Sequence, residues 1–338
     1  MSFGIDARRR QARFLSTSRF FSAAAQARTT DKERRNPYLL AEGYELENLY
    51  PGLRSGKATA YFAERGIKWW RSTRSGDNAA VNGPTKNLAS SQVACVNFLL
   101  PFSENAEALG AIASALDHDV QAVLPIEYES RATRRRCGAL VDFEWVGLES
   151  TLEGGAYNRG ANATSADALL VAETTSGHKR AYLFEWKYVE EYPFDEDKGV
   201  GPSGATRRRR YEHLYSAADS PFNGVAPFEA MLYEPFYQLM RLGLLGAKMV
   251  REKEFGVSEA RVVVVCPEEN KEYLERVTSP ILRNTFPRST LDKVVRRTTR
   301  VSDAIRFTSQ SALASAIRGQ RFVEAAEWFE YHEARYGW

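Results

Sequence analysis

Two strand-like segments joined by a short turn constrain the fold of this chain more than any other feature. The segments SADALLVAE (165–173) and KRAYLFEWKYVE (179–190) are rich in Val, Leu, Phe, Tyr and Trp and alternate in polarity. The turn between them contains Gly177, and glycine readily adopts the positive φ that tight hairpin turns need. The sequence therefore predicts an antiparallel pair in which Asp167 begins one strand and Glu185 lies within the next.

This hairpin would bring two carboxylates and one ammonium group together. Residues i and i+2 of a strand point to the same face, so Glu185 and Lys187 share a face while Trp186 points into the opposite layer. Asp167, which 17 residues separate from Glu185, comes alongside. Two carboxylates can bind Mg²⁺ and leave positions for water and a phosphate oxygen, and a lysine can hold the attacking water or help to deprotonate it. Hydrolysis of a phosphodiester is the reaction that this set favours.

The segments around the hairpin predict a mixed α/β order. A helix over Ser90 to Leu100 and a second over 104–117 precede strands in AVLPIEYE (122–129) and GALVDFEWVG (138–147). After the hairpin, the charged Gly/Pro/Ser-containing segment 195–210 is expected to be a mobile loop, and 228–250 is expected to be one long helix. The apolar run of RVVVVCP (261–267) is typical of a buried parallel strand, and the remainder is expected to be mainly helical.

In this order of elements and residues, the sequence resembles the PD-(D/E)XK nuclease superfamily. The resemblance implies an α/β, restriction-endonuclease-like core: a mixed central sheet, made of an antiparallel meander plus a parallel strand, flanked by helices, with added N- and C-terminal helices. The proline of the motif is absent, because Ala166 precedes Asp167. RGANATSADALLVAE with EWK, SSQVACVNFLLPF and PFYQLMRLG also resemble a family of bacterial restriction-endonuclease-like proteins over most of residues 65–338.

The resemblance also implies roles for individual residues. Asp167 and Glu185 would ligate Mg²⁺ or Mn²⁺, and Lys187 would be the catalytic lysine. Gln238 matches a glutamine that some nuclease branches use near the site, and Arg241 shares its helix face and could reach a phosphate. The implied function is a Mg²⁺-dependent DNA endonuclease in bacterial restriction, defence or mobile-element biology.

A second acidic strand, VDFEWVG, leaves the role of Glu144 open. Alternation predicts that Asp142, Glu144 and Val146 share one face, and no lysine stands at position 146. Glu144 could be an auxiliary metal ligand or a structural partner of an arginine. Glu127 in LPIEYE competes for the same role.

Clustered arginines favour a phosphate backbone as partner, although the net charge is only +3. Residues 1–36 carry nine Arg or Lys against three acidic residues, and two further clusters lie at 131–136 and 207–210. Each run could also be a solvated surface. The candidate nucleic-acid contacts are Arg134, Arg135, Arg159, Arg207, Arg208 and Arg241, with Gln92 as a polar position on an otherwise apolar helix. DNA is the expected partner, and RNA is not excluded.

The sequence predicts a basic N-terminal arm or helix over 1–44 and a single nuclease-like domain over 45–338. No apolar run approaches the roughly 18 residues of a membrane helix, and three scattered cysteines fit a reducing cytoplasm. A homodimer is possible, because nuclease cores often cut both strands as dimers. Two alternatives remain: a nucleic-acid-binding or assembly protein that keeps the fold without cleaving, and an organellar protein whose first 30 residues are a transit peptide. The complete Asp, Glu and Lys set argues against the first.

Overall fold

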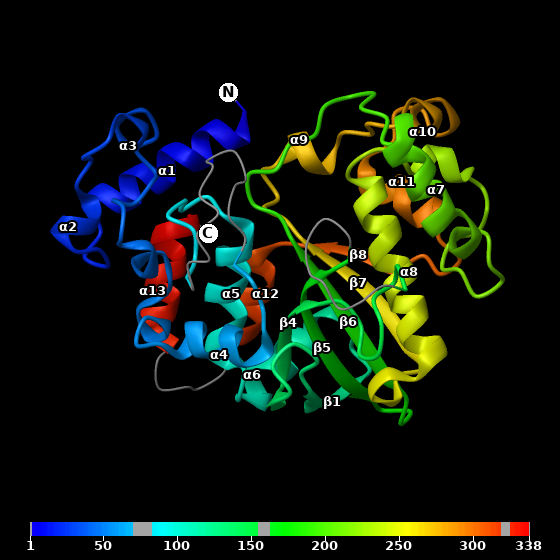
Figure 1. Ribbon diagram of the computed structural model, residues 1–338, viewed down its shortest axis with the longest axis horizontal. Coiled ribbons are helices and arrows are strands. Elements are labelled where there is room, and N and C mark those ends of the chain that lie inside the picture. Colours follow the sequence, from blue (N-terminus) through cyan, green and yellow to red (C-terminus); the bar gives the residue numbers. More distant parts are fainter. Residues whose placement is uncertain (1, 70–82, 155–162, 319–324, 338) are drawn as a thin grey trace.

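The computed structural model describes residues 2–69, 83–154, 163–318 and 325–337, and a mixed six-stranded sheet lies at its centre (Figure 1). The strand order is β1-β5-β6-β7-β8, and β4 pairs with the other half of β5. The strands of this sheet are β1 (Val120–Leu124), β4 (Val141–Trp145), β5 (Ala166–Thr174), β6 (Lys179–Trp186), β7 (Glu259–Val265) and β8 (Ile305–Thr308). The mixed sheet between helices confirms the predicted fold class.

The predicted hairpin is formed by β5 and β6. Their antiparallel register runs from Ala168 opposite Phe184 to Glu173 opposite Lys179, and Gly177 in the turn has a φ of 78°. The apolar run that begins at Val262 belongs to β7, which is parallel to β6 and has β8 on its other side. Both faces of the sheet are covered, which explains why β7 is apolar throughout its buried part.

Two helical layers cover the sheet, one on each face (Figure 1). Ala168, Leu170 and Ala172 of β5 join the hydrophobic cluster that includes α5, whereas Leu169 and Val171 join the cluster that includes α8. The helices of the first layer are α1 (Phe3–Thr17), α4 (Lys57–Arg65), α5 (Ser91–Leu99), α6 (Ala106–Leu116), α12 (Gln310–Ile317) and α13 (Ala325–Tyr336). Those of the second are α7 (Gly201–Tyr215), α8 (Phe236–Glu252), α9 (Lys271–Leu274), α10 (Pro280–Thr285) and α11 (Leu291–Thr298).

Short elements complete the described fold. They are α2 (Ala23–Gln26), α3 (Asp31–Arg35), the two-stranded ribbon of β2 (Ile126–Glu129) and β3 (Arg136–Ala139), and the 3₁₀ turns η1 (Glu45–Asn48), η2 (Pro51–Leu53), η3 (Leu100–Phe102), η4 (Phe228–Met231) and η5 (Glu254–Gly256). The expected strand over 122–129 is two strands, because Pro125 interrupts the ladder and sends β1 and β2 into different sheets.

Two other predictions were wrong. The expected loop over 195–210 contains most of α7, whose Tyr211 and Tyr215 are four positions apart and bury their rings in the cluster beside α8. The expected single helix over 228–250 is the turn η4 followed by α8, because Pro235 lacks the amide hydrogen that a continuous helix would use.

The N-terminal helix α1 packs against α13, which follows it by three hundred residues in the chain (Figure 1). Phe3, Ala7, Phe14 and Leu15 of α1 are buried in the same cluster as α5, and the Phe14 ring meets the edge of Tyr331. Among the described residues, no helix is long and apolar enough to cross a membrane.

Candidate active site

The predicted carboxylate and ammonium groups meet at one end of the β5–β6 hairpin. Glu185 and Lys187 are almost fully buried, and the Lys187 Nζ lies 2.7 Å from Glu185 Oε1. Burial alone would lower the pKa of Lys187, but the charge of Glu185, with Tyr192, Tyr273 and Glu190 nearby, raises this pKa well above its usual value. Lys187 is therefore held as a cation at neutral pH.

Gln238 of α8 contacts both of these side chains. Its Oε1 accepts a hydrogen bond from Lys187 Nζ at 2.8 Å, and its Nε2 donates to Glu185 Oε1 at 2.8 Å. The Lys187 ammonium and the Glu185 carboxylate are thus bridged by one amide. Glu185 Oε2 is buried and accepts no hydrogen bond from the described residues, so this oxygen is available to a ligand.

Asp167 lies beside this pair and is turned toward β6. Its Oδ2 accepts a hydrogen bond from the Trp186 backbone N–H at 2.7 Å, just beyond the last ladder pair, Ala168 opposite Phe184. Burial and the negative charges of Glu185 and Glu144 raise the pKa of Asp167 well above its usual value. Burial also raises the pKa of Glu185, although Lys187 opposes this effect. The negative charges of Asp167, Glu185 and Glu144 therefore lie close together, and Lys187 offsets them only in part.

Glu144 reaches the same cluster through an irregular backbone. Its φ is 51°, a conformation that is uncommon for a residue other than glycine. The prediction that strict alternation holds through this strand was wrong, because Phe143 joins the cluster beside α5 while Trp145 joins the cluster beside α8. The Glu144 carboxylate accepts hydrogen bonds from Gln92 Nε2 at 2.7 Å and from Ser165 Oγ at 2.9 Å.

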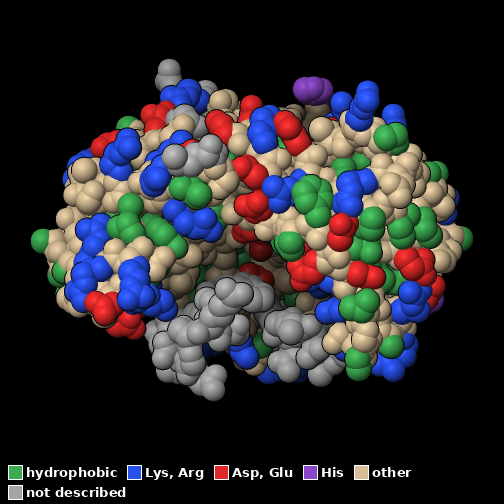
Figure 2. All heavy atoms as spheres, turned by 90° about the horizontal axis from the view of Figure 1, so that it is seen from above, with side chains coloured by type: hydrophobic (Ala, Val, Ile, Leu, Met, Phe, Trp, Pro, Cys, Tyr) green, Lys and Arg blue, Asp and Glu red, His purple; other side chains and the backbone are tan. Residues whose placement is uncertain are grey.

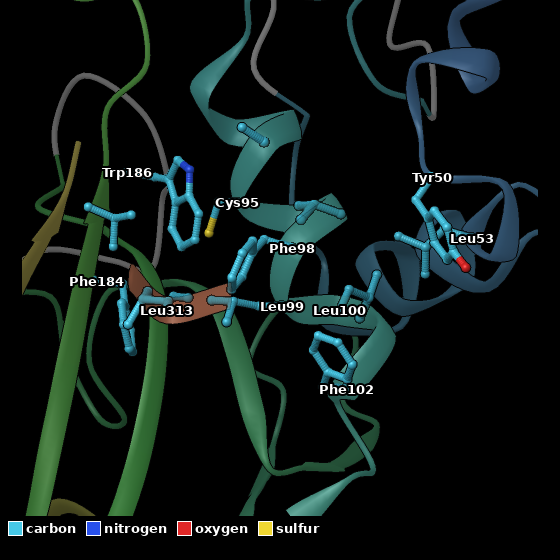
Figure 3. Packing of buried hydrophobic residues seen from close by; sticks show 14 of the residues in the cluster. Tyr50, Leu53, Cys95, Phe98, Leu99, Leu100, Phe102, Phe184, Trp186 and Leu313 are labelled. Atoms are coloured by element: carbon cyan, nitrogen blue, oxygen red, sulfur yellow. The ribbon is translucent and has the colours of Figure 1, made fainter. Parts of the chain in front are cut away.

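The opposite side of β6 is apolar. Trp186 points toward Phe98 and Cys95 of α5, with Phe184 and Leu313 nearby (Figure 3). The ring centroids of Trp186 and Phe98 are 5.2 Å apart. This packing fixes the strand, so that Glu185 and Lys187 are presented to α8 on the other face.

Arg241 lies one helical turn beyond Gln238, and part of its guanidinium has no hydrogen-bond partner among the described residues. Its guanidinium lies 4.7 Å from the ring centroid of Tyr237, it donates a long hydrogen bond to Thr164 Oγ1 at 3.5 Å, and its Nε is buried without a partner among the described residues. The Arg241 charge also lowers the pKa of Glu185, which places it near the carboxylates. A guanidinium with unused donors near such a site could bind a phosphate.

Sequence reasoning missed two tyrosines that line this site. Lys187 Nζ lies 3.4 Å from the Tyr192 hydroxyl and 5.9 Å from the centre of its ring. The Tyr273 hydroxyl is buried without a hydrogen-bond partner among the described residues, and its ring is 6.1 Å from that of Tyr192. No periodic pattern marks either tyrosine, and only the position of Tyr192 five residues after Lys187 could have suggested it.

Several of the other predicted residues form ion pairs on the surface, whereas Arg207 lies over Tyr237, the ring that Arg241 also faces. Glu127 is exposed on the β2–β3 ribbon and pairs with Arg136, so it is not an auxiliary ligand of this site. Arg134 pairs with Glu129, and Arg135 is exposed on the same ribbon. On α7, Arg208 pairs with Glu212 and Glu229, while Arg207 donates to the Lys198 carbonyl and lies over Tyr237. Arg159 lies outside the described residues.

The surface above this end of the sheet is hollowed between two lobes. One lobe is formed by the helices of the first layer and the other by the helices of the second layer. Figure 2 shows acidic side chains along the floor of the hollow and Lys and Arg side chains on both sides of it. A negative floor with basic walls suits a polyanion whose charge is partly offset by a cation.

A comparison with protein families identifies a family that matches most of the chain. The profile of a family described as Restriction Endonuclease associating with ARP matches residues 27–337. Comparisons with curated proteins and with solved structures give no match. The matched residues contain all of the sheet and every side chain of the candidate site. Because the profile spans most of the chain, this protein belongs to the family of restriction endonucleases associating with ARP.

Proposed function

We propose that the protein is a Mg²⁺-dependent endonuclease that hydrolyses DNA phosphodiester bonds, with Asp167, Glu185 and Lys187 as its catalytic residues. The observation that carries this proposal is the buried contact of Glu185 with Lys187, 2.7 Å long, beside the under-compensated carboxylate of Asp167. The placement of these three residues on one hairpin supports the resemblance to the PD-(D/E)XK nucleases, and the family match supports the same class of enzyme.

The residues present fit a divalent cation. Glu185 Oε2 is buried without a partner among the described residues, and repulsion from Glu185 and Glu144 acts on Asp167, so added positive charge would satisfy both. The donors are hard carboxylate oxygens, which suit Mg²⁺ or Mn²⁺. Within the described residues, no group of three or more His, Cys, Asp or Glu side chains is arranged to hold a metal ion. Two carboxylates are what Mg²⁺ commonly takes from a protein when a phosphate and waters complete its shell.

Asp167 and Glu185 would hold the cation, with Glu144 as an auxiliary group that Gln92 and Ser165 orient. When bound, the cation would make a water more acidic and offset the charge that develops on the phosphate. The charge of Glu185 raises the pKa of Lys187 well above its usual value, so this ammonium would donate hydrogen bonds to the water or to the phosphate.

The contacts of Lys187 indicate which of its donors meets the substrate. An ammonium has three N–H groups, and here they face Glu185 Oε1 at 2.7 Å, Gln238 Oε1 at 2.8 Å and Tyr192 Oη at 3.4 Å. The longest contact is the weakest, so an oxygen of the water or the phosphate would displace Tyr192 at least cost. Arg241, with unused donors, would hold a second phosphate oxygen.

Plasmid cleavage tests this proposal. We expect nicking in Mg²⁺, none in EDTA, and rates about two to three orders of magnitude lower for Asp167→Asn and Lys187→Met. Glu173→Gln and Lys179→Met are matched controls, because these residues lie at the other end of the same hairpin. If all four variants cleave like the wild type, the proposal is wrong. If the protein binds DNA with a steep salt dependence but never cleaves it in Mg²⁺ or Mn²⁺, it is a non-cleaving binding protein.

A further inference from the structure

We propose that the exposed face of the N-terminal helix α1 binds the phosphate backbone of duplex DNA that flanks the bond cleaved at the Lys187 site. The inference rests on the proposed function for the identity of the nucleic acid. It assigns a binding surface to a helix that lies before residues 27–337, the part of the chain that the family profile matches.

The N-terminal half of α1 lies against the segment that follows β6. Gln11 Nε2 donates a hydrogen bond to the hydroxyl of Tyr188 at 2.8 Å, and the Phe3 ring meets the Tyr188 ring edge-on, with centroids 6.3 Å apart. Tyr188 is buried and immediately follows Lys187. A Cβ placed on Gly4 would lie 3.5 Å from the Val189 carbonyl oxygen. The helix therefore starts beside the segment that follows Lys187, on the side of the sheet that α5 covers.

The two faces of α1 differ in character. Its inner face is buried, and Arg10 ties the helix to α13 by donating to the Tyr336 carbonyl, while Arg8 donates to the Gly4 carbonyl within α1. Arg9 and Arg13 are exposed on the outer side, and Arg9 has Asp6 at 3.6 Å, with both of these side chains more than half exposed. Such an open ion pair exchanges readily for a phosphate contact, because exposed pairs are worth little.

The spacing of these arginines matches a nucleic-acid strand. Four helical positions correspond to about 6 Å along the axis, and two nucleotides of one strand span about 7 Å. Counted from Gly4, Arg9 and Arg13 lie about 7 and 13 Å along the helix. They could therefore contact phosphates within a few nucleotides of a bond placed at Lys187.

The segment that contains α1 also carries more positive than negative charge. Residues 1–36 carry nine Arg or Lys against three acidic residues. Figure 1 places α1, α2 and α3 on one lobe, and Figure 2 shows Lys and Arg side chains gathered over that lobe beside the hollow. The exposed arginines of α1 therefore belong to a segment with an excess of positive charge beside the hollow, which fits a polyanion.

The test is the affinity for a fluorescent DNA duplex, measured by anisotropy over a range of salt concentrations. An Asp167→Asn background prevents cleavage, and Arg9→Glu with Arg13→Glu removes the proposed contacts. Two phosphate contacts correspond to a slope of log K against log salt that is smaller by about 1.8, and to an affinity lower by on the order of 50-fold at about 0.1 M salt. Lys57→Glu with Arg251→Glu makes the same change in net charge on α4 and α8 and is expected to change the affinity by less than about threefold.

Unchanged affinity and salt slope in the Arg9 and Arg13 variant overturn the inference, as does an equal loss in the control pair. Arg9→Gln with Arg13→Gln is a milder second variant, and thermal unfolding checks that each variant is folded. Cleavage by the protein with Asp167 intact is scored separately. If it cleaves while the α1 variants bind normally, the inference fails and the proposed function stands. If it never cleaves but the α1 variants bind weakly, the DNA surface stands and the proposed function fails.

Discussion

Removing the Lys187 ammonium tests the electrostatics of the site independently of catalysis. Met is close to Lys in length and carries no charge, so Lys187→Met leaves the Glu185 carboxylate buried, with Gln238 as its hydrogen-bond donor among the residues that the structure describes. Breaking a buried ion pair in this way costs about 3–5 kcal/mol of unfolding free energy, because one charge remains without compensation. At a urea m value of about 3 kcal/mol/M, the unfolding midpoint in EDTA should fall by about 1 M or more.

A double-mutant cycle separates the charge effect from the lost packing. Adding Glu185→Gln to Lys187→Met removes the uncompensated charge of the Glu185 carboxylate. The unfolding free energy of the double variant should therefore exceed, by about 2 kcal/mol, the value expected from adding the two single losses. Mg²⁺ should stabilise Lys187→Met more than the wild type, because the cation supplies the missing positive charge. Urea unfolding followed by circular dichroism, with and without Mg²⁺, gives all of these values.

The chain contains a matched control for this experiment. Lys248 and Glu254 are also buried and lie 3.2 Å apart, and Glu254 Oε2 has no partner among the described residues; Lys248 also contacts Glu252 at 2.6 Å. Lys248→Met with Glu254→Gln should show a similar coupling energy and no response to Mg²⁺. Additive losses at Lys187 and Glu185, or an equal Mg²⁺ effect on both pairs, would refute the reasoning.

Three further predictions concern other groups. Burial lowers the pKa of His332 well below its usual value, with Arg335 adding to the effect, so its stability contribution is present above pH 6.5 and is lost as the pH falls, by about 1.4 kcal/mol per pH unit. His332→Gln should flatten the fall in unfolding free energy between pH 7 and pH 5.5, and an unchanged slope would contradict this. The raised pKa of Asp167 has the opposite sign: stability is lost as the pH rises through the folded-state pKa, so Asp167→Asn should raise the melting temperature in EDTA at pH 8 and not at pH 4. Arg241→Lys keeps the charge but loses the planar donor pair, so kcat/KM for DNA should fall by about tenfold; wild-type kinetics would exclude a phosphate contact there.

The parts of the fold that were predictable from sequence are those that local patterns specify. Period-two alternation and a glycine-containing turn are enough to place Asp167, Glu185 and Lys187 on one hairpin, and the i,i+3 relation places Gln238 and Arg241 on one face of α8. The contacts of Gln238 with both Glu185 and Lys187 follow from that helix packing over β6.

The parts that were missed depend on tertiary contacts. In 195–215 the Gly, Pro and Ser residues favour a loop locally, but the burial of Tyr211 and Tyr215 against the α8 layer outweighs that preference and forms α7. Tyr192 belongs to no repeating pattern, and only the return of the chain past Lys187 brings it into contact.

Glu144 connects the irregular backbone of β4 to the chemistry of the site. In a regular strand, Phe143 and Trp145 would share a face and Glu144 would point to the other. The left-handed residue at 144 instead sends Phe143 to the α5 layer and Trp145 to the α8 layer, while the Glu144 carboxylate turns to Gln92 and Ser165. Such a conformation costs about 1–3 kcal/mol and persists only where neighbouring contacts hold it. Here those contacts also hold a third negative charge near Asp167. The contacts that hold the strained backbone at Glu144 therefore also hold its carboxylate near Asp167, where the proposed cation would offset the negative charge.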